Sequence, residues 1–407
     1  MTPSEMVALA DVCEINPRLP KGHPLSDDTN VSFVPMAAVD ETDGAIGVRR
    51  VRPFSEVKKG YTSFRDNDVL FAKITPCMEN GKAAVARDLQ GSYGFGSTEF
   101  HVLRATSRVL AEWIFYFVRR EQFRAEAKRS FTGTAGQQRV PASFLHSVQI
   151  PVPPLPQQHR LVDILSRAES IVRLRREAQK KAAELIPALF LDTFGDPATN
   201  LKGWPVLTLG ELVEEFRYGT SQKSGPSGLP VLRIPNVIGD RLELSDMKLV
   251  DIPDAEANRL RLSDGDVLFV RTNGNTDYVG RSAVFTRKIM EFAGFDGANT
   301  MYASYLIRAR LCREGVEPTF LQAYLSSIHG RRVLKERCRT SAGQFNINTA
   351  GLSSIPVPVP PKPLQIAFVR HSQNVSALRD QQSTATTQAE ATFNALLAHS
   401  ISISTMQ

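Results

Sequence analysis

The chain has 407 residues, of which 42% are hydrophobic and 22% charged, and its formal net charge at pH 7 is +7. This composition excludes a disordered chain, and the mild basicity permits an anionic partner such as nucleic acid without establishing one. No apolar run approaches the roughly 18–20 residues that a membrane helix needs, so we expect no membrane contact. The cysteines are far apart and the N-terminal residues lack a basic signal region, so we expect a cytoplasmic protein.

Strands and a helix are predicted along the first half of the chain. Short runs rich in β-branched and aromatic residues, bounded by Gly, Asn, Asp or Pro, predict strands at 31–36, 68–73 and 98–105. A helix is predicted near 111–129. The segment Pro151–Pro154 then predicts a stiff extended spacer, because proline fixes φ and biases the preceding residue toward extended structure.

A long helix is predicted after this spacer, over residues 156–194. Apolar residues recur there every three or four positions and define one helix face. The members are Leu161, Ile164, Ala168, Ile171, Leu174, Ala178, Ala182, Leu185 and Leu189. A helix of about 30–40 residues extends about 45–60 Å. A helix of that length with one narrow apolar face needs a partner helix.

The second half of the chain repeats this order of elements. Strands are predicted at 229–234, 266–271 and 304–310, a helix near 318–337, a second spacer at Pro358–Pro361 and a second long helix over 363–402. The tripeptide Ala135-Gly136-Gln137 and the first spacer match Ala342-Gly343-Gln344 and the second spacer at one constant offset. The segment Asp68-Val69-Leu70-Phe71 likewise matches Asp266-Val267-Leu268-Phe269. We interpret these matches as a tandem duplication.

The sequence therefore predicts an α+β protein with a pseudo-two-fold internal repeat. Two similar globular domains, at 1–152 and 199–359, are separated and joined by long helices at 156–194 and 363–402. We expect the two helices to pair as a coiled coil. The alternative is that each helix packs only on its own globular neighbour.

No catalytic motif is evident. Glycine-rich phosphate loops and the signatures of metalloproteases and serine hydrolases are absent, and the histidines lack metal-ligand spacing, so we expect no catalytic residue, metal or cofactor in this chain. The carboxylate pairs Asp66/Asp68 and Asp264/Asp266 are interpreted as polar turns before buried strands rather than as metal ligands. Residues Gln157–His159, at the start of a helix, are predicted to be solvated. A non-enzymatic binding protein is the simplest interpretation.

Two segments carry a local excess of basic residues. Residues 104–139 and 308–339 each contain eight Lys or Arg against three acids. Binding of a polyanion releases counterions in proportion to its cationic contacts, so duplicated basic segments indicate two equivalent sites on one long anion. The alternative is a solvated helix face.

Side chains that can read bases lie in Gly-containing loops of both halves. Arg and Lys pair with guanine, and Asn and Gln pair with adenine. The candidate DNA-binding residues of the first half are Lys73, Asn80, Lys82, Gln137, Gln138 and Arg139. Those of the second half are Arg271, Asn273, Asn275, Arg281, Gln344 and Asn346. The Asn-Gly pairs are also typical of hairpin turns, an interpretation that does not exclude a contact with DNA.

The order of these parts resembles the specificity subunit of Type I restriction–modification systems. The resemblance is carried by the segments PVPPLPQQHRLVDIL and PVPPKPLQIAFVRHS, the AGQ tripeptides before them, FGDPATNLKGWPVLTLGEL at the head of the second half, and DVLFAK with DVLFVR. It extends over essentially the whole chain.

This resemblance implies a DNA-binding protein of phage defence, with two target-recognition domains that each read one half of a bipartite, non-palindromic site in the major groove of double-stranded DNA. Antiparallel helices would set the spacer. Two modification subunits would bind S-adenosylmethionine and transfer the methyl group. Restriction subunits would carry the nuclease and the ATP- and Mg²⁺-dependent motor. Exposed helix cations are candidates for contact with these partners, with solubility as the alternative: Arg173, Arg175, Arg176, Lys180 and Lys181.

Two other functions stay open at the level of sequence. One is a protein-interaction scaffold with two heads, and the other is a DNA-modifying enzyme with an unrecognised site. Deletion of residues 1–150 tests the scaffold, because only a specificity subunit would lose recognition of one half-site. Incubation of the chain alone with S-adenosylmethionine or Mg²⁺ tests the enzyme.

Overall fold

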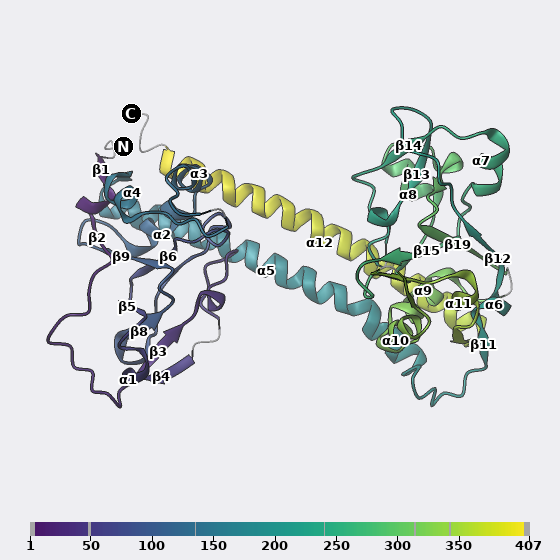
Figure 1. The fold of residues 1–407 in the computed structure, drawn as a ribbon, viewed down its shortest axis with the longest axis horizontal. Helices are drawn as coiled ribbons and strands as arrows, with labels where there is room; N and C mark the ends of the chain where they lie inside the picture. Colours follow the sequence, from purple (N-terminus) through teal and green to yellow (C-terminus); the bar gives the residue numbers. More distant parts are fainter. Residues whose placement is uncertain are drawn as a thin grey trace. The chain divides into compact units, whose positions relative to one another are not determined.

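The computed structural model describes residues 5–47, 50–134, 136–239, 241–312, 315–341 and 343–402 (Figure 1). The chain divides into two compact units: unit 1 comprises residues 1–178 and 382–407, and unit 2 comprises residues 179–381. Each unit contains a globular part and one end of each of two long helices, α5 (Leu155–Phe194) and α12 (Lys362–Ser402). Among the described residues, no helix combines the length and apolar character needed to cross a lipid bilayer.

Unit 1 is built on two four-stranded sheets and a separate pair of strands. The strands are β1 (Glu5–Ala8), β2 (Cys13–Ile15), β3 (Asn30–Val34), β4 (Arg50–Pro53), β5 (Thr62–Arg65), β6 (Val69–Ala72), β7 (Ala83–Val85), β8 (Tyr93–Gly96), β9 (Phe100–Ala105) and β10 (Gln149–Val152). One sheet has the order β2-β9-β6-β7 and is antiparallel throughout. The other has the order β4-β3-β8-β5, in which β3 and β8 run parallel. The pair β1-β10 is antiparallel.

The central strand β6 is buried along its whole length because both faces of its sheet are covered. Val69 and Phe71 belong to a core formed with the helices, whereas Leu70 and Ala72 belong to a core shared with residues of β3 and β5. Successive side chains of a strand point to opposite faces, so a strand between two cores reads as an unbroken apolar run. The matching run in unit 2, residues 267–270, is divided between two cores in the same way.

Unit 2 repeats this topology. Its strands are β11 (Val206–Thr208), β12 (Val213–Tyr218), β13 (Leu229–Leu232), β14 (Lys248–Val250), β15 (Val267–Val270), β16 (Thr272–Asn273), β17 (Ser282–Val284), β18 (Met301–Tyr302), β19 (Leu306–Leu311), β20 (Arg339–Ser341), β21 (Gln344–Asn346) and β22 (Pro356–Pro358). The order β12-β19-β15-β17 matches β2-β9-β6-β7, and β11-β22 matches β1-β10. The sheet β14-β13-β18, with β13 and β18 parallel, matches the first three strands of β4-β3-β8-β5. The fold therefore confirms the predicted α+β class and internal repeat.

The helix expected after the strands is divided into two in each unit. The pairs are α2 (Ala111–Arg119) with α3 (Glu121–Arg129), and α9 (Pro318–Ser326) with α10 (Ile328–Glu336). The predictions of single helices over 111–129 and 318–337 are therefore wrong. Arg120 and Ser327 adopt extended ψ angles of 142° and 159°, and the Ser327 side chain accepts a hydrogen bond from Gly330 N–H, which starts a new helix.

Short helices complete the two globular parts. The α-helices are α1 (Phe54–Val57), α4 (Ala142–Ser147), α6 (Leu209–Leu212), α7 (Asp254–Leu260), α8 (Arg287–Phe292) and α11 (Thr349–Ser353). The 3₁₀ helices are η1 (Leu9–Asp11), η2 (Met36–Ala38), η3 (Gln90–Ser92), η4 (Ile234–Asn236) and η5 (Gly297–Asn299).

The two long helices run antiparallel within each unit. In unit 1, Leu165 near the start of α5 shares a core with Leu397 and Ile401 at the end of α12. In unit 2, the Phe194 ring at the end of α5 lies 5.2 Å from the Phe368 ring near the start of α12. The two helices therefore pack on each other, as expected, and each also enters the core of the globular part.

The buried face of α5 differs in part from the predicted one, of which Ala182 is buried. Ile171 and Leu174, assigned to the apolar seam, are 53% and 57% exposed, whereas Leu165 and Val172 are 0% and 6% exposed. Apolar residues occur on two faces of this helix, and spacing alone does not distinguish them. Leu378 of α12, also assigned to the seam, is 40% exposed.

Candidate nucleic-acid interface

The same buried ion pair stands at the start of the central strand in both units. Arg104 donates to both carboxylate oxygens of Asp68, with Nε–Oδ1 and Nη2–Oδ2 distances of 2.8 and 2.7 Å. Arg310 binds Asp266 with the same atoms at 2.9 and 2.7 Å. The aspartates are 1% and 2% exposed. These carboxylates hold the frame together, in agreement with their interpretation as structural groups.

The other end of the central strand brings two distant candidate segments together. In unit 1, Val140 N–H donates to the carbonyl of Lys73 at 2.9 Å, and Thr75 N–H donates to the carbonyl of Gln138 at 3.0 Å. In unit 2, Ile347 N–H donates to the carbonyl of Arg271 at 2.9 Å. The loop that contains the repeated AGQ tripeptide therefore returns to the basic residue after the strand in both units. Ala135 and Ala342 of the tripeptides lie outside the described residues.

We call the place where the AGQ loop meets the segment after the central strand the junction of each unit. The backbone pairing at this junction also repeats. Isolated bridges link Arg139 to Ile74 and to Thr132 in unit 1. In unit 2, Asn346 of β21 pairs with Thr272 of β16 and with Arg339 of β20, which forms a small sheet. The main chain is therefore similar at the two junctions, whereas the side chains that it presents differ.

The junction of unit 1 contains one neutralised cation. Arg139 donates to both carboxylate oxygens of Glu99, each at 2.9 Å. Hydrogen bonding from Arg139 holds the pKa of the Glu99 carboxyl below its ordinary value. Gln137 is exposed, Gln138 and Lys73 are half-buried, and no ion pair involves Lys73 among the described residues.

A buried histidine contacts the backbone of this junction. His101, which is 5% exposed, lies 2.9 Å through Nε2 from the carbonyl of Val140 and 2.9 Å through Nδ1 from Nδ2 of Asn16. The neutral ring with its proton on Nε2 satisfies both contacts. Burial lowers the pKa of His101, which favours that neutral form.

The two remaining candidates of unit 1 point away from the junction. Asn80 donates to Glu41 at 3.2 Å. Lys82 pairs through its backbone with Ala72, but its Nζ donates to the carbonyl of Met36 at 3.4 Å. We therefore place neither side chain with Lys73 and Gln138.

The junction of unit 2 carries stacked arginines. The Cζ atom of Arg271 lies 4.8 Å from the centre of the Tyr218 ring, and that of Arg281 lies 3.8 Å from the centre of the Tyr278 ring. Gln344 accepts a hydrogen bond from the Thr272 hydroxyl at 3.1 Å.

The three candidate asparagines of unit 2 mainly stabilise their own loops. The side-chain oxygens of Asn273 and Asn275 accept from backbone N–H groups two residues on, both at 2.9 Å. Asn346 Nδ2 donates to the carbonyl of Gln344 at 3.4 Å. The carboxamides of the first two thus retain their N–H donors for another partner.

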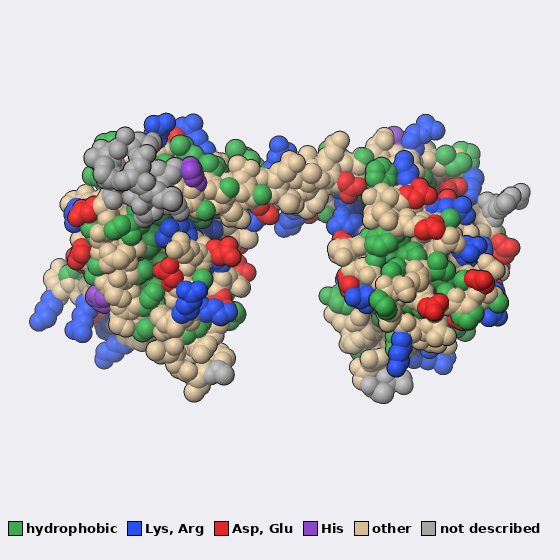
Figure 2. Space-filling view, turned by 90° about the horizontal axis from the view of Figure 1, so that it is seen from above, with side chains coloured by type: hydrophobic (Ala, Val, Ile, Leu, Met, Phe, Trp, Pro, Cys, Tyr) green, Lys and Arg blue, Asp and Glu red, His purple; other side chains and the backbone are tan. Residues whose placement is uncertain are grey.

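The basic segments are largely neutralised within their own units. In residues 104–139, ion pairs join Arg104 to Asp68, Arg108 to Glu5, Arg119 to Glu169, Lys128 to Glu79 and Arg139 to Glu99. In residues 308–339, they join Arg308 to Glu215, Arg310 to Asp266, Lys335 to Asp277 and Arg337 to Glu336, while Arg313 lies outside the described residues. Figure 2 accordingly shows Lys and Arg interspersed with Asp and Glu on the face drawn of each unit. On that face, the described residues of the two segments form no continuous cationic strip.

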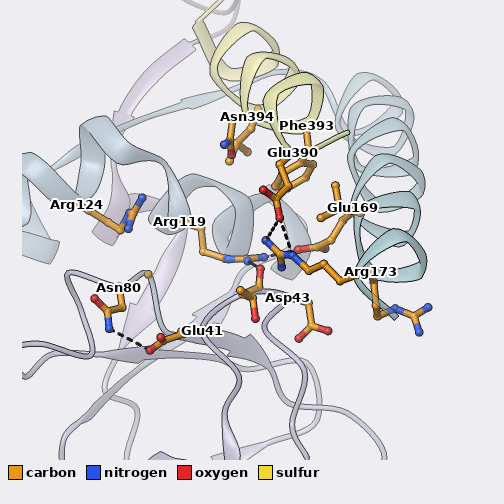
Figure 3. Close-up of a pocket in the computed structure, with 15 residues that line it drawn as sticks. Glu41, Asp43, Asn80, Arg119, Arg124, Glu169, Arg173, Glu390, Phe393 and Asn394 are labelled. Carbon is orange, nitrogen blue, oxygen red and sulfur yellow. Dashed lines mark hydrogen bonds and ion pairs between the residues drawn. The ribbon is translucent and has the colours of Figure 1, made fainter. Parts of the chain in front are cut away.

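Unit 1 has a charged cavity of about 210 Å³ between its globular part and both long helices. Figure 3 shows Arg119 of α2 extending toward Glu169 of α5, with which it forms an ion pair. Arg176 of α5 binds Glu390 at 2.7 Å. Acidic and basic side chains are equal in number around this cavity. Their ion pairs link the two helices to each other and to the globular part.

A buried glutamine fastens the start of each long helix. Gln158 accepts a hydrogen bond from Leu110 N–H at 2.9 Å and donates to the carbonyls of Arg108 and Pro153 at 3.0 and 2.8 Å. Gln365, at the same place in the repeat, accepts from Glu317 N–H at 2.8 Å and donates to the Pro360 carbonyl at 2.7 Å.

These glutamines are 0% and 1% exposed, so the prediction that Gln158 is solvated is wrong. Their common distance from the two proline spacers was the sequence signal that could have identified them. Within the described residues, no group of three or more His, Cys, Asp or Glu side chains is placed to hold a metal ion.

Comparison with known proteins shows which proteins this chain resembles. Residues 1–184 match the family model described as the Type I restriction modification DNA specificity domain. The chain is 37% identical over 164 residues to the EcoEI specificity subunit of Escherichia coli, which covers 40% of this chain and 27% of that protein. It is 26% identical over 293 residues to the EcoKI specificity subunit of Escherichia coli K12, which covers 69% of this chain and 61% of that protein. The chain thus spans less than two thirds of the length of either relative.

A solved structure shares the whole fold. It comes from work on complex assembly and conformational transition of the type I R-M system, and it matches with a TM-score of 0.60 at 22% identity over 98% of each chain. Residues 1–184 therefore match a DNA specificity domain of Type I restriction–modification systems, and the chain is similar to the specificity subunits of such systems.

Proposed function

We propose that the chain is the DNA sequence-recognition subunit of a Type I restriction–modification complex and catalyses no reaction itself. Residues 1–152 and 199–359 are then target-recognition domains, each of which reads one half of a bipartite, non-palindromic site in the major groove. The helices at 156–194 and 363–402 set the spacer between the half-sites.

The observation that supports this proposal is a backbone arrangement that repeats in both units but presents different side chains. Both units have the same Asp–Arg pair at one end of the central strand and the same backbone junction at the other. At that junction Lys73 of unit 1 corresponds to Arg271 of unit 2, and Arg139 corresponds to Asn346. A common frame with different side chains is what the reading of two different half-sequences needs, because bases are distinguished by the donors and acceptors presented to them.

The partners follow from the same proposal. Double-stranded DNA binds the two junctions, two modification subunits supply S-adenosylmethionine-dependent methyl transfer, and restriction subunits supply the nuclease and the ATP- and Mg²⁺-dependent motor in the cytoplasm. Of the helix cations considered for these contacts, Arg173 binds Glu177, Arg175 binds Gln382 and Arg176 binds Glu390. Lys180 and Lys181 are exposed and are the better candidates for a partner surface.

Selection from a pool of random duplexes tests the proposal. The full chain, assembled with its modification subunits, is compared with Gln137→Ala in unit 1 and Gln344→Ala in unit 2. We expect wild type to enrich a split motif, and each substitution to relax base preference in one half only. Enrichment of no motif by the wild-type complex would overturn the proposal, as would an equal effect of each substitution on both halves.

A further inference from the structure

Arg271 has the geometry of a base-reading side chain that is held ready before DNA arrives. Its backbone is fixed on both sides, because its N–H donates to the carbonyl of Tyr305 at 2.9 Å and its own carbonyl accepts from Ile347 N–H at 2.9 Å. The Arg271 side chain is half-buried, and its guanidinium stacks on Tyr218 at 4.8 Å. Within the described part of the chain, no carboxylate or hydrogen-bond acceptor engages that guanidinium.

Tyr218, on which this guanidinium stacks, is itself held in place by two contacts. It ends β12, where its backbone pairs with Ile307 of β19, and its hydroxyl oxygen accepts a hydrogen bond from Thr349 N–H at 3.4 Å. Tyr218 is 37% exposed. A guanidinium stacked on an aromatic ring is stabilised without using its N–H donors. The planar pair of N–H donors of Arg271, its fork, therefore stays available for a ligand in a restricted set of orientations.

Other cations of the candidate set lack this combination. Arg139 uses its fork on Glu99, and Lys82 donates to the carbonyl of Met36. Lys73, the counterpart of Arg271 in unit 1, makes no ring contact among the described residues, and an ammonium group has no planar fork. Arg281 is stacked but lies close to Asp277, whose pKa is lowered chiefly by Lys335 and also by Arg281.

We propose that Arg271, stacked on Tyr218, reads a guanine in the half-site bound by unit 2. This inference rests on the proposed function. Guanine presents two acceptors, O6 and N7, on its major-groove edge, and a guanidinium fork matches both at once. Adenine replaces one acceptor with a donor and thymine presents a methyl group, so an arginine without an acid partner favours guanine over both. No corresponding guanine contact is expected from Lys73 with the same selectivity.

The test measures base preference at every position of the split motif with the assembled complex. The variants are Arg271→Ala, Arg271→Lys, Tyr218→Leu and Tyr218→Phe, with Lys288→Ala as a control cation exposed on the same unit. Arg271→Ala and Arg271→Lys should each lower guanine discrimination roughly 5- to 150-fold at one position in the second half-site. Tyr218→Leu should weaken that discrimination, whereas Tyr218→Phe and Lys288→Ala should preserve it.

Three results would overturn the inference while leaving the proposed function intact. The first is unchanged base preference in Arg271→Ala. The second is a uniform loss of affinity for all sequences, which would make Arg271 a phosphate contact. The third is full discrimination retained by Arg271→Lys, which would exclude a bidentate fork. A wild-type complex with no base preference in either half would instead contradict the proposed function itself.

Discussion

Arg104 binds the buried carboxylate of Asp68 through two hydrogen bonds, and the relationship recurs between Arg310 and Asp266. Each pair joins the start of the central strand to its neighbour in the sheet. The carboxylates also accept from backbone N–H groups of the preceding turns, at 2.7 Å from Arg65 and 2.9 Å from Ser263. The frame that presents the candidate side chains is thus fixed at the end away from them.

Removal of one partner from this pair should destabilise unit 1 strongly. Asp68→Asn leaves the Arg104 guanidinium, whose side chain is 17% exposed, with only the exposed carboxylate of Glu14 at 3.9 Å. We expect a loss of about 3–5 kcal/mol in the free energy of unfolding, because the remaining charge loses its buried, doubly hydrogen-bonded partner. The exposed pair Lys58–Asp27 provides the control, and Lys58→Ala should cost at most about 1 kcal/mol. Denaturant unfolding measures both, and equal losses in the two variants would contradict the assignment.

Gln158, at the start of α5, should contribute more to the free energy of unfolding than its exposed neighbour His159. Gln158→Ala leaves the N–H of Leu110 and two carbonyls without their partner, and an unsatisfied buried group costs about 1–3 kcal/mol. His159 follows Gln158 directly and is exposed. His159→Ala should therefore change the unfolding free energy by less than about 0.5 kcal/mol. The account of this contact fails if the two variants unfold at the same denaturant concentration.

The face of α5 that packs inward is testable with adjacent residues. Leu165 is fully buried and Ile164 is 37% exposed. Leu165→Ala should therefore cost about 2–5 kcal/mol, whereas Ile164→Ala should cost clearly less. Calorimetric or denaturant unfolding decides between them. A larger effect at Ile164 would restore the helix face that simple apolar spacing predicts.

Acid should weaken unit 1 through His101. Because burial lowers its pKa, the folded state resists protonation while the unfolded chain takes up a proton near the ordinary value of 6.5. The stability contributed by the neutral ring is complete above that value and is lost as the pH falls below it, toward the lowered pKa of the folded state. His101→Gln should reduce the fall in unfolding midpoint between about pH 7 and 5. An identical pH dependence in wild type and variant would exclude His101 as its source.

The repeat and the main elements were predictable because their signals are local. The apolar run after Asp68 and after Asp266 marks a strand buried on both faces, and the proline spacers mark the start of each long helix. The AGQ loops were also recognisable as a pair. Their approach to Lys73 and Arg271 required the fold, since the hydrogen bonds join segments far apart in the sequence.

The remaining features depend on tertiary contacts that leave weak local signals. Neither Arg120 nor Ser327 is a glycine or proline, so the break between the paired helices is not evident from composition. Arg104 and Asp68 are separated in sequence and meet only when β9 pairs with β6. The sequence likewise does not show that cations of the two basic segments form ion pairs, because most of their acidic partners lie elsewhere in the chain.

Mapping of methylated bases in a genome that encodes the chain with its modification subunits tests the central claim most directly. The account predicts one motif in two unlike parts, separated by a gap of fixed length and unspecified sequence, and loss of that motif when the gene for the chain is deleted. An uninterrupted or palindromic motif that depends on the chain would contradict it, and so would methylation that persists unchanged after the deletion.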